Sequence, residues 1–518
     1  MARMSVTLVV CLLIVLSAGC ASVATRGINK PRATALQNPR ETRLGAQFLD
    51  LSASHAGMSG YRLIRAGVDG LALRVQIIRN AERTLDLQYF IFRGDATGTL
   101  ITEELRRAAD RGVRVRVIVD DGDTAPGDEH ILELDGHPNM QVRIFNPFDT
   151  RSHSALARNL DFLFHKSRLD YRMHNKLLVA DNAIAVTGGR NIGNQYFQVD
   201  PESQFADDEV FAGGPIAQTL SAEFDEFWNC DVVVPASRLG ALPAYQPPAS
   251  PPVVRGSGTN YLERADSGEP YRSLISGQQP LVWASARLVF DSPDKRFIEQ
   301  GEERGRLMSR EVEREIGAAR KESLIVSPYF APSEAELSLL EKLRARKAAV
   351  RILTNSLESA PSLAAQSGYA KIRVRLLQDG VKLYEVRSRL GSTLGSGQTS
   401  RVSRYGNYAL HAKLYVFDRQ RCFIGSWNYD ERSLHINTEM GLLIDSAEFA
   451  EEVAQRVDEM TSPTEAYEVL LDSEHEGKLV WQTQLNQQLV RLHSEPSRGW
   501  WRKERERLLL LLPLQPEL

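Results

Sequence analysis

Two segments of the chain carry the same pattern of residues with the chemistry to handle a phosphodiester. The first is MHNKLLVADNAIAVTGGRN from Met173, and the second is LHAKLYVFDRQRCFIGSWN from Leu410. Each has a His and a Lys two positions apart, so that on a β-strand both side chains project from one face. Asp, Gly and Asn follow at the same spacing in both copies. Chance does not give such a register twice, so the pair predicts one site built from a repeat.

The paired residues supply every group that transfer of a phosphodiester requires. A neutral imidazole can attack phosphorus to give a phosphohistidine, while a second, protonated imidazole gives its proton to the leaving alcohol. Two lysines can hold the negative oxygens, and two asparagine amides can donate to the same phosphate. We therefore expect no metal and no other cofactor, and turnover that survives chelators. The spacing alone does not say which imidazole attacks.

The surrounding sequence predicts the elements that position these groups. Apolar, β-branched residues around each His-x-Lys pair predict a strand, and a polar step at Asp181 or Asp418 precedes a second apolar run, which predicts a hairpin. A turn between strands favours Asp for structural reasons alone. The upstream segments repeat as strand, helix and strand, starting from Leu85 and from Ser323. The predicted fold class is therefore α/β, with two halves that each contain a mixed sheet flanked by helices.

The pattern H-x-K-x4-D-x6-G-x-x-N, present twice, resembles the signature of the phospholipase D superfamily. The segments RMHNK, GGRNIG, SPYF, LTNS, SGYAK and NTEMG further resemble bacterial cardiolipin synthases of the lipoprotein-like class, from about His55 to the carboxyl end. The resemblance implies two phospholipase D-like halves about a pseudo-twofold axis, with the active site at the seam. The chain departs from the family at Gly189, where Ser is usual, and at Asn194-Gln195, where Asp-Glu is expected.

The resemblance also implies roles for individual residues. It makes His174 the nucleophile and His411 the acid, an order that the local sequence leaves open. Glu439 matches the position of one carboxylate that orients an imidazole, and Asp207 matches the other, although its acidic surroundings also suit an ordinary loop. The candidate catalytic residues are His174, Lys176, Asp181, His411, Lys413 and Asp418, and the candidate phosphate-binding residues are Asn191, Asn428 and Ser426.

The activity implied by the resemblance is phosphatidyl transfer to give cardiolipin. The substrates would be phosphatidylglycerol and a second phospholipid, either phosphatidylethanolamine or phosphatidylglycerol. Water as acceptor would make the same site a phospholipase D, and the motif also suits a nuclease or, without catalysis, a lipid-binding scaffold. With 63 Lys and Arg against 66 Asp and Glu, the net charge of −3 argues against nucleic acid as a partner. The sequence leaves open the two lipids, any accessory protein and the oligomeric state.

The amino terminus predicts export and attachment to a membrane. Arg3 and the apolar stretch from Val6 to Ala18 indicate a signal peptide, and LSAGC resembles the lipobox, in which the Cys becomes acylated. An ordinary cleavable signal peptide is the alternative. Ala21 after Cys20 resembles an outer-membrane sorting signal, with the inner membrane as the second candidate location. We therefore expect a lipid-anchored protein of the bacterial cell envelope that faces the periplasm.

Composition divides the chain into six expected parts. They are a signal peptide at 1–19, a tether at 20–40, the first half at 41–242, a Pro-rich linker at 243–260, the second half at 261–460 and a C-terminal extension at 461–518. In the extension, Trp500, Trp501 and several basic residues precede the run from Leu508 to Leu512. This order suits a membrane interface, and a terminal helix packed on the core is the alternative.

Overall fold

A computed structural model gives the structure of the chain. It describes residues 28, 30–124, 129–149, 155–239, 260–295, 306–388, 407–475, 477–497 and 500–510. Residues 1–27, with the predicted signal peptide and Cys20, lie outside these ranges, as does nearly all of the Pro-rich linker. Among the described residues, no helix combines the length and the apolar character needed to cross a bilayer.

A mixed sheet forms the first half. Its order is β9 (Val233–Pro235), β4 (Met140–Phe145), β3 (Arg114–Asp120), β2 (Thr84–Tyr89), β5 (Lys176–Ala180), β6 (Ile184–Gly188), β8 (Glu209–Gly213) and β1 (Ser59–Ile64). Strands β2, β3 and β4 are parallel, and helix α4 (Ala96–Asp110) connects the first two. The motif hairpin β5–β6 is antiparallel to its neighbours, as the predicted sequence of strand, helix, strand and hairpin requires.

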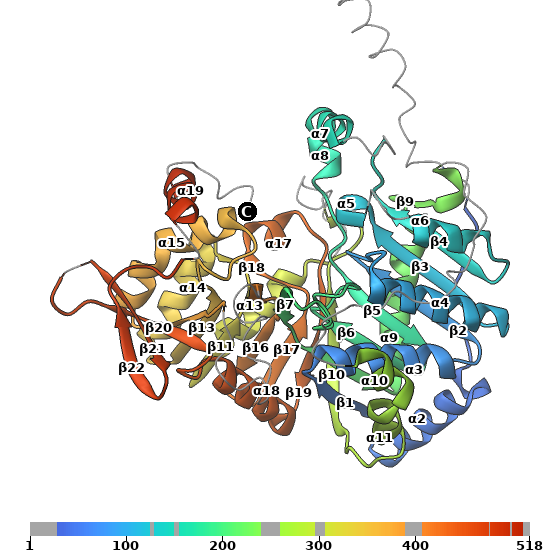
Figure 1. Ribbon diagram of the computed structural model, residues 1–518. Coiled ribbons are helices and arrows are strands. Elements are labelled where there is room, and N and C mark those ends of the chain that lie inside the picture. The colour runs from blue at the N-terminus through green and yellow to red at the C-terminus, as the bar shows by residue number, and fades with distance from the viewer. Residues whose placement is uncertain are drawn as a thin grey trace, which may run out of the picture.

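Seven strands of the second half repeat this order, read in the reverse direction from β1 to β4. Their order is β10 (Val282–Phe290), β19 (Met440–Asp445), β17 (Arg421–Gly425), β16 (Leu414–Phe417), β11 (Glu322–Val326), β13 (Ala349–Asn355) and β14 (Lys382–Val386). Strand β10 pairs antiparallel with its counterpart β1, so the two sheets meet about a pseudo-twofold axis (Figure 1). The predicted α/β fold of two related halves is confirmed.

Among the described residues, three hydrophobic clusters hold the layers together. Helices α3 (Gly67–Asn80) and α4 contribute to a cluster on one face of the first sheet. Helices α13 (Met308–Ala318), α14 (Glu334–Ala345) and α15 (Leu363–Gln378) contribute to the equivalent cluster of the second sheet. The remaining cluster contains residues of both halves, including α9 (Pro215–Asn229) and α18 (Ala447–Met460). The seam is therefore held by a continuous apolar core.

The packing crosses two of the expected domain boundaries. Helices α10 (Tyr261–Ser267) and α11 (Glu269–Ile275) follow the linker but pack on α3, because their apolar residues belong to the core of the first half. Past residue 460, β20 (Ala466–Leu471) pairs with β14, and β21 (Leu479–Leu485) and β22 (Gln488–Leu492) widen the second sheet. Helix α19 (Trp500–Leu510) lies against α15. This contact is the alternative considered for the C-terminal segment, a terminal helix packed on the core.

The described part of the expected tether lies along the first half. The main chain of Ala33 exchanges hydrogen bonds of 3.2 and 2.9 Å with the side chain of Asn229. The Ala35 N–H donates to Asp225 at 2.7 Å, and the Asn182 amide donates to the Leu36 carbonyl at 2.8 Å. These contacts fix residues 33–36, because polar main-chain groups next to a folded surface gain partners by lying along it. Any part of the tether that is free of the first half would therefore be shorter than the expected residues 20–40.

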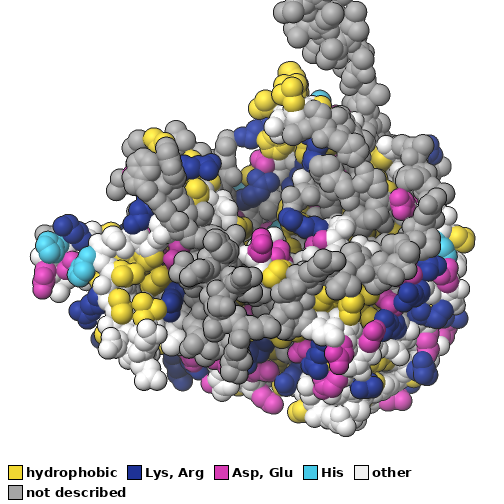
Figure 2. Space-filling view, in the orientation of Figure 1, with side chains coloured by type: hydrophobic (Ala, Val, Ile, Leu, Met, Phe, Trp, Pro, Cys, Tyr) yellow, Lys and Arg dark blue, Asp and Glu magenta, His cyan; other side chains and the backbone are white. Residues whose placement is uncertain are grey.

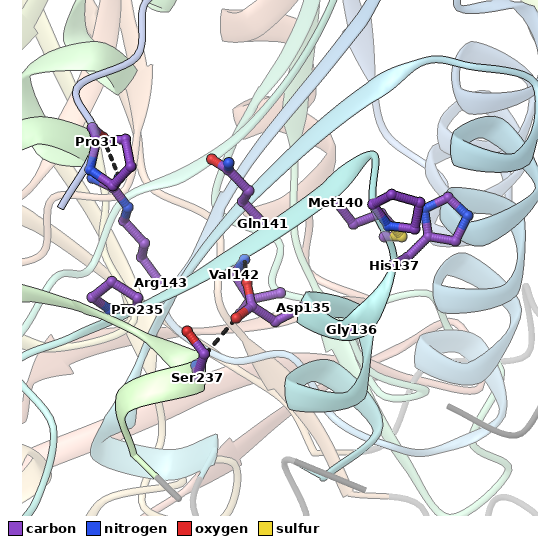
Figure 3. Close-up of a pocket in the computed structure, with 11 residues that line it drawn as sticks. Pro31, Asp135, Gly136, His137, Met140, Gln141, Val142, Arg143, Pro235 and Ser237 are labelled. Atoms are coloured by element: carbon purple, nitrogen blue, oxygen red, sulfur yellow. Dashed lines mark hydrogen bonds between the residues drawn. The ribbon is translucent and has the colours of Figure 1, made fainter. Parts of the chain in front are cut away.

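A pocket of about 350 Å³ lies where this segment meets β4 and β9. Arg143 reaches across it and donates to the carbonyl oxygen of Pro31 at 2.6 Å, while the Ser237 N–H donates to Asp135 at 3.1 Å (Figure 3). None of the lining residues belongs to the repeated motifs. The pocket is thus separate from the predicted site.

The motif aspartates lie at the hairpin turns, at the opposite end of the strands from the histidines. Asp181 and Asp418 both have a φ of 55°, which Asp tolerates better than most residues. The carboxylate of Asp181 accepts hydrogen bonds from the N–H groups of residues 82–84, and that of Asp418 from residues 320–322. The structure does not bring these two candidate catalytic residues to the imidazoles. Instead, Asp181 holds the first hairpin against β2, and Asp418 holds the second against β11.

We expect Asp181→Ala to weaken the fold and to spare the chemistry. The substitution leaves the buried N–H of Thr84 and the partly buried N–H groups of Glu82 and Arg83 without an acceptor, which costs about 3 kcal/mol of unfolding free energy. Denaturant unfolding would measure the loss, and kcat of the folded fraction should change by less than about threefold. A large fall in kcat at an unchanged unfolding midpoint would instead place Asp181 in the chemistry.

Candidate active site

Two buried imidazoles face the seam, and each is held by a carboxylate of the opposite half. Nδ1 of His174, just ahead of β5, lies 2.8 Å from Oε2 of Glu439. Nδ1 of His411, just ahead of β16, lies 2.5 Å from Oδ2 of Asp207. Because Nδ1 of each ring is engaged, Nε2 is the nitrogen left to react. The two carboxylates expected to orient the histidines are thus both found beside them.

Main-chain pairing across the seam fixes this crossed arrangement. Strand β7 (Ser203–Ala206) of the first half runs parallel to β15 (Asn407–Leu410), and the His411 N–H donates to the Ala206 carbonyl at 2.8 Å. On the other side, the His174 N–H donates to the Thr438 carbonyl at 2.9 Å. Asp207 and Glu439 each directly follow, in the sequence, the residue whose carbonyl accepts one of these bonds. The register therefore delivers the carboxylate and the imidazole to the same place.

Two further residues, which are not among those predicted from the motif, hold the backbone ahead of each histidine. Asp120, at the end of β3, accepts a hydrogen bond from the Met173 N–H at 2.8 Å. Asn355, at the end of β13, accepts one from the Leu410 N–H at 2.8 Å. Both side chains are fully buried, and burial raises the pKa of Asp120 to about 6. Asp120 and Asn355 are each the last residue but one of two equivalent segments, VRVRVIVDD from Val113 and VRILTNS from Val350. The repeat was therefore the signal that could have found them.

Both motif lysines are buried beside the histidines. Lys176 donates to the carbonyl oxygen of His174, and Lys413 donates to that of His411 at 2.5 Å. Burial lowers the pKa of Lys176 well below its ordinary value and that of Lys413 to about 8, although nearby carboxylates oppose the change. A phosphate anion bound between them would offset this cost, because an opposite charge favours the protonated amine.

We expect kcat/KM to fall above about pH 8 as Lys413 loses its proton, because a neutral amine no longer attracts phosphate oxygens. The guanidinium of a Lys413→Arg variant stays protonated. Its alkaline fall should therefore move to higher pH, even if its absolute rate is lower. Initial rates between about pH 6 and pH 10 would show this. The same alkaline fall in both proteins would contradict the role of Lys413.

The two carboxylates differ in charge. Burial raises the pKa of Glu439 to about 7, against the attraction of Lys176. Burial acts in the same direction on Asp207, but His411 and Lys413 outweigh it, so that the pKa of Asp207 lies below its ordinary value. Burial and Lys176 hold the pKa of His174 well below its ordinary value, and burial and Lys413 lower that of His411 to about 3. His411 thus faces the fully ionised carboxylate.

The asparagines offer unsatisfied polar atoms to the site. Oδ1 of Asn191 accepts a hydrogen bond from the Ile91 N–H at 3.1 Å, which orients the amide. Its Nδ2 is buried and has no hydrogen-bond partner among the described residues. The amide oxygen of Asn428 is likewise buried without a partner in that part of the chain. Since buried polar atoms are normally paired, the free Nδ2 of Asn191 is suited to donate to a bound phosphate.

Ser426, a candidate phosphate-binding residue, contacts the carboxylate beside His174. Its hydroxyl donates to the carboxylate of Glu439 and accepts a hydrogen bond from the Met440 N–H at 3.0 Å. The hydroxyl therefore holds the carboxylate that orients His174. Asn194, at the other departure from the family, accepts a hydrogen bond from the Thr97 N–H at 3.0 Å near the start of α4, so it supports a helix.

In the first half, Gly189 occupies the position equivalent to Ser426, and the structure leaves no room there for a side chain. A Cβ added to Gly189 would lie 2.1 Å from Oδ1 of Asp207, so the carboxylate fills the space that a side chain would take. We expect Gly189→Ala to displace Asp207 and to lower kcat by about 10²-fold, as misplaced catalytic groups do. Activity assays and thermal unfolding of the same preparation would separate this from a folding defect. A fully active variant would show that Asp207 tolerates the shift.

Aromatic rings enclose both histidines. Phe90 packs edge-on against His174, with ring centroids 5.1 Å apart. Tyr196 and Phe205 lie against His411 at 5.1 and 5.2 Å. These rings restrict rotation of the imidazoles and give the site apolar walls. His174 and His411 retain exposures of only 7% and 6%, so the reacting groups lie in a largely dehydrated environment.

Two buried His-x-Lys pairs, each completed by a carboxylate of the other half, define an enzyme of the phospholipase D type. The family model described as "Cardiolipin synthase, PLD-like domain" matches residues 75–228 and 312–461. The chain therefore belongs to the cardiolipin synthase family of the phospholipase D superfamily, which confirms the resemblance seen in the sequence.

Individual relatives agree with this assignment. The chain is 34% identical to cardiolipin synthase C of Escherichia coli K12 over 91% of its own length and 99% of the relative's. It is 25% identical to cardiolipin synthase A of Proteus mirabilis over 79% and 71% of the two chains. The crystal structure of phosphatidylserine synthase from Haemophilus influenzae matches with a TM-score of 0.55 at 13% identity, over 83% and 93%. That last likeness shows the shared fold.

Proposed function

We propose that the protein transfers a phosphatidyl group from one phospholipid to the headgroup hydroxyl of phosphatidylglycerol and so forms cardiolipin. The observation that carries the proposal is the pair of buried imidazoles, each bound to a carboxylate of the opposite half. Membership of the cardiolipin synthase family supports the choice of lipid substrates. The donor is a second phosphatidylglycerol or phosphatidylethanolamine.

In the proposed first step, Nε2 of His174 attacks phosphorus and the bond from phosphorus to the headgroup oxygen breaks. His411 gives its Nε2 proton to the leaving alkoxide, which departs as glycerol or ethanolamine. In the second step, a hydroxyl of phosphatidylglycerol loses its proton to His411 and attacks phosphorus. The bond between phosphorus and His174 then breaks and the imidazole is restored. Lys176 and Lys413 stabilise the phosphate oxygens throughout.

The charge difference between the carboxylates supports this order of roles. Burial and the neighbouring lysines lower the pKa of both imidazoles, so either could be the neutral one that attacks, and only the carboxylates distinguish them. His411 faces the ionised Asp207, which stabilises the imidazolium that an acid must carry. The reverse order would put the imidazolium beside Glu439, whose pKa near 7 leaves it partly neutral.

The product formed from defined vesicles tests the proposal. Purified full-length protein would be incubated with phosphatidylglycerol vesicles, with and without phosphatidylethanolamine, and the lipids resolved by mass spectrometry. We expect cardiolipin, with release of glycerol or ethanolamine, and no product from His174→Ala. Phosphatidic acid as the sole product would show that water is the acceptor. Absence of both products would contradict the proposed activity.

We also propose that Cys20 is acylated and anchors the protein in the bacterial cell envelope, facing the periplasm. The lipobox-like LSAGC supports this, and Ala21 favours the outer membrane. Mass spectrometry of the N-terminal peptide should find a lipid on Cys20, and Cys20→Ser should lack it. An unmodified terminus after a different cleavage position would support the ordinary signal peptide.

A further inference from the structure

Helix α7 (Ala155–Phe164) exposes an apolar face to solvent. Leu156, Leu160, Leu163 and Phe164 have exposures of 70%, 45%, 69% and 73%. Their spacing places all four on one side of the helix. Figure 2 shows hydrophobic side chains gathered on the projection at the top of the molecule, where Figure 1 places α7. A group of large apolar side chains this exposed indicates a surface with a partner.

The exposed charge next to this face is positive. Lys166 lies just past the end of α7 and is exposed, whereas Arg168 is paired with Asp149 at 3.0 Å and Arg158 lies over the ring of Phe148. The single acidic residue from 155 to 169 is Asp161, whose side chain is only 7% exposed and lies 2.8 Å from Nδ1 of His165. The segment therefore presents the cation of Lys166 beside the apolar face and no exposed carboxylate of its own. This combination is typical of helices that lie in the interface of an anionic bilayer.

Polar contacts at the base of α7 fix the helix to the part of the first half that leads to His174. Asp149 lies 3.0 Å from the guanidinium of Arg168 and 3.5 Å from His165, which closes a polar cluster at the base of α7. The Asn146 amide donates to the carbonyl oxygens of Arg168 and Tyr171, both at 2.7 Å. Helix α8 (Lys166–Leu169) then ends only five residues before His174. Helix α7 thus projects from the segment that leads directly into the site.

Helix α19 projects from the same side of the molecule as α7 (Figure 1). Its Leu508 has an exposure of 65%. Two separate helices, one from each half, therefore lie on the same side of the molecule, and each carries an exposed apolar side chain. A flat partner could contact both at once.

We propose that the apolar face of α7 inserts into the interface of an anionic phospholipid bilayer and holds the entrance of the site against the membrane. The proposal rests on the proposed function, since phospholipid substrates reside in that bilayer. A second copy of this chain is a poorer partner, because a symmetric contact through α7 would bring Lys166 of one copy toward Lys166 of the other. The bilayer supplies both the apolar interior and the negative charge that the face lacks.

A fluorescent probe on the helix tests insertion without any need for turnover. A polarity-sensitive fluorophore would be attached to Leu163→Cys in the full-length chain, with Leu489→Cys on β22 as the control. Leu489 has an exposure of 61% but lies on another element. Phosphatidylglycerol vesicles should shift the emission of the Leu163 probe to shorter wavelength and leave the control unchanged. The unsubstituted chain, treated with the same reagent, gives the background from native cysteines.

Two outcomes would overturn the proposal. One is an unchanged emission from the Leu163 probe on protein that has sedimented with the vesicles. The other is a shift that grows with protein concentration in the absence of lipid, which would indicate self-association. Because the probe reports insertion directly, a protein that inserts but makes no cardiolipin would contradict the proposed function alone.

Kinetics provide the second test. We expect the double variant Leu160→Glu/Phe164→Glu to lower turnover of phosphatidylglycerol vesicles by at least about tenfold, because charged residues replace apolar anchors. Turnover of a short-chain phosphatidylglycerol dissolved as monomers should stay within about twofold, since the catalytic groups are untouched. The matched control is Leu485→Glu/Leu489→Glu on the β21–β22 hairpin, which should leave both rates unchanged. Equal loss on vesicles and on monomers would contradict a membrane role for α7.

Discussion

A His174→Ala enzyme should lose phosphatidyl transfer by at least about 10⁴-fold, because removal of a covalent nucleophile also removes the two-step route through phosphohistidine. The fold should survive the change. The imidazole lies ahead of β5, outside the strand itself, and its Nδ1 is bound to Glu439. Product formation from phosphatidylglycerol vesicles measures the loss, and thermal unfolding serves as the control.

His411→Ala should behave differently and identify the nucleophile. Without the acid, attack by His174 continues slowly while expulsion of the alcohol and its replacement by an acceptor are impaired. Labelled phosphatidyl groups should therefore accumulate on His174, where peptide mapping would find them. A label on any other residue, or a stable adduct in His174→Ala, would reverse the assignment of the two histidines.

Asp207→Asn should reduce kcat by about 10³-fold or more, whereas Glu439→Gln should reduce it by only about tenfold near pH 7. Asp207 is ionised and stabilises the imidazolium of His411, so an amide removes a full charge from the reacting pair. Glu439 has a pKa of about 7 and is held by Ser426, so a neutral side chain there resembles a state that is already populated.

The pH dependence sharpens this comparison. In the wild type, loss of the proton from Glu439 through pH 7 increases the negative charge beside His174, and Glu439→Gln removes that titration. The variant should therefore lack any inflection of kcat near pH 7, while Asp207→Asn keeps it. Equal losses of kcat in the two variants, at comparable unfolding midpoints, would contradict the proposed division of roles.

The repeat made much of the molecule predictable from sequence. Two copies of one motif, each after a strand, a helix and a strand, are local patterns, and local patterns report strand faces and helix ends. They predicted the two α/β halves and the residues His174, Lys176, His411 and Lys413, which the structure places at the seam. Position within a motif did not reveal function equally well. Asp181 and Asp418 share the motif but lie at the hairpin turns, where they bind main-chain N–H groups.

Contacts between distant segments were decided by the tertiary structure. Which carboxylate serves which imidazole depends on two main-chain pairings across the seam, β7 with β15 and Met173 with Thr438, and no local pattern carries that register. The position of Asp207 also explains why Gly189 has no side chain, because the carboxylate occupies its space. The charge of Lys413 and Glu439 also depends on burial by both halves, since loss of hydration is a property of the packed environment. The sequence by itself therefore determined the reactive groups, whereas the packing of one half on the other determined their partners and their protonation.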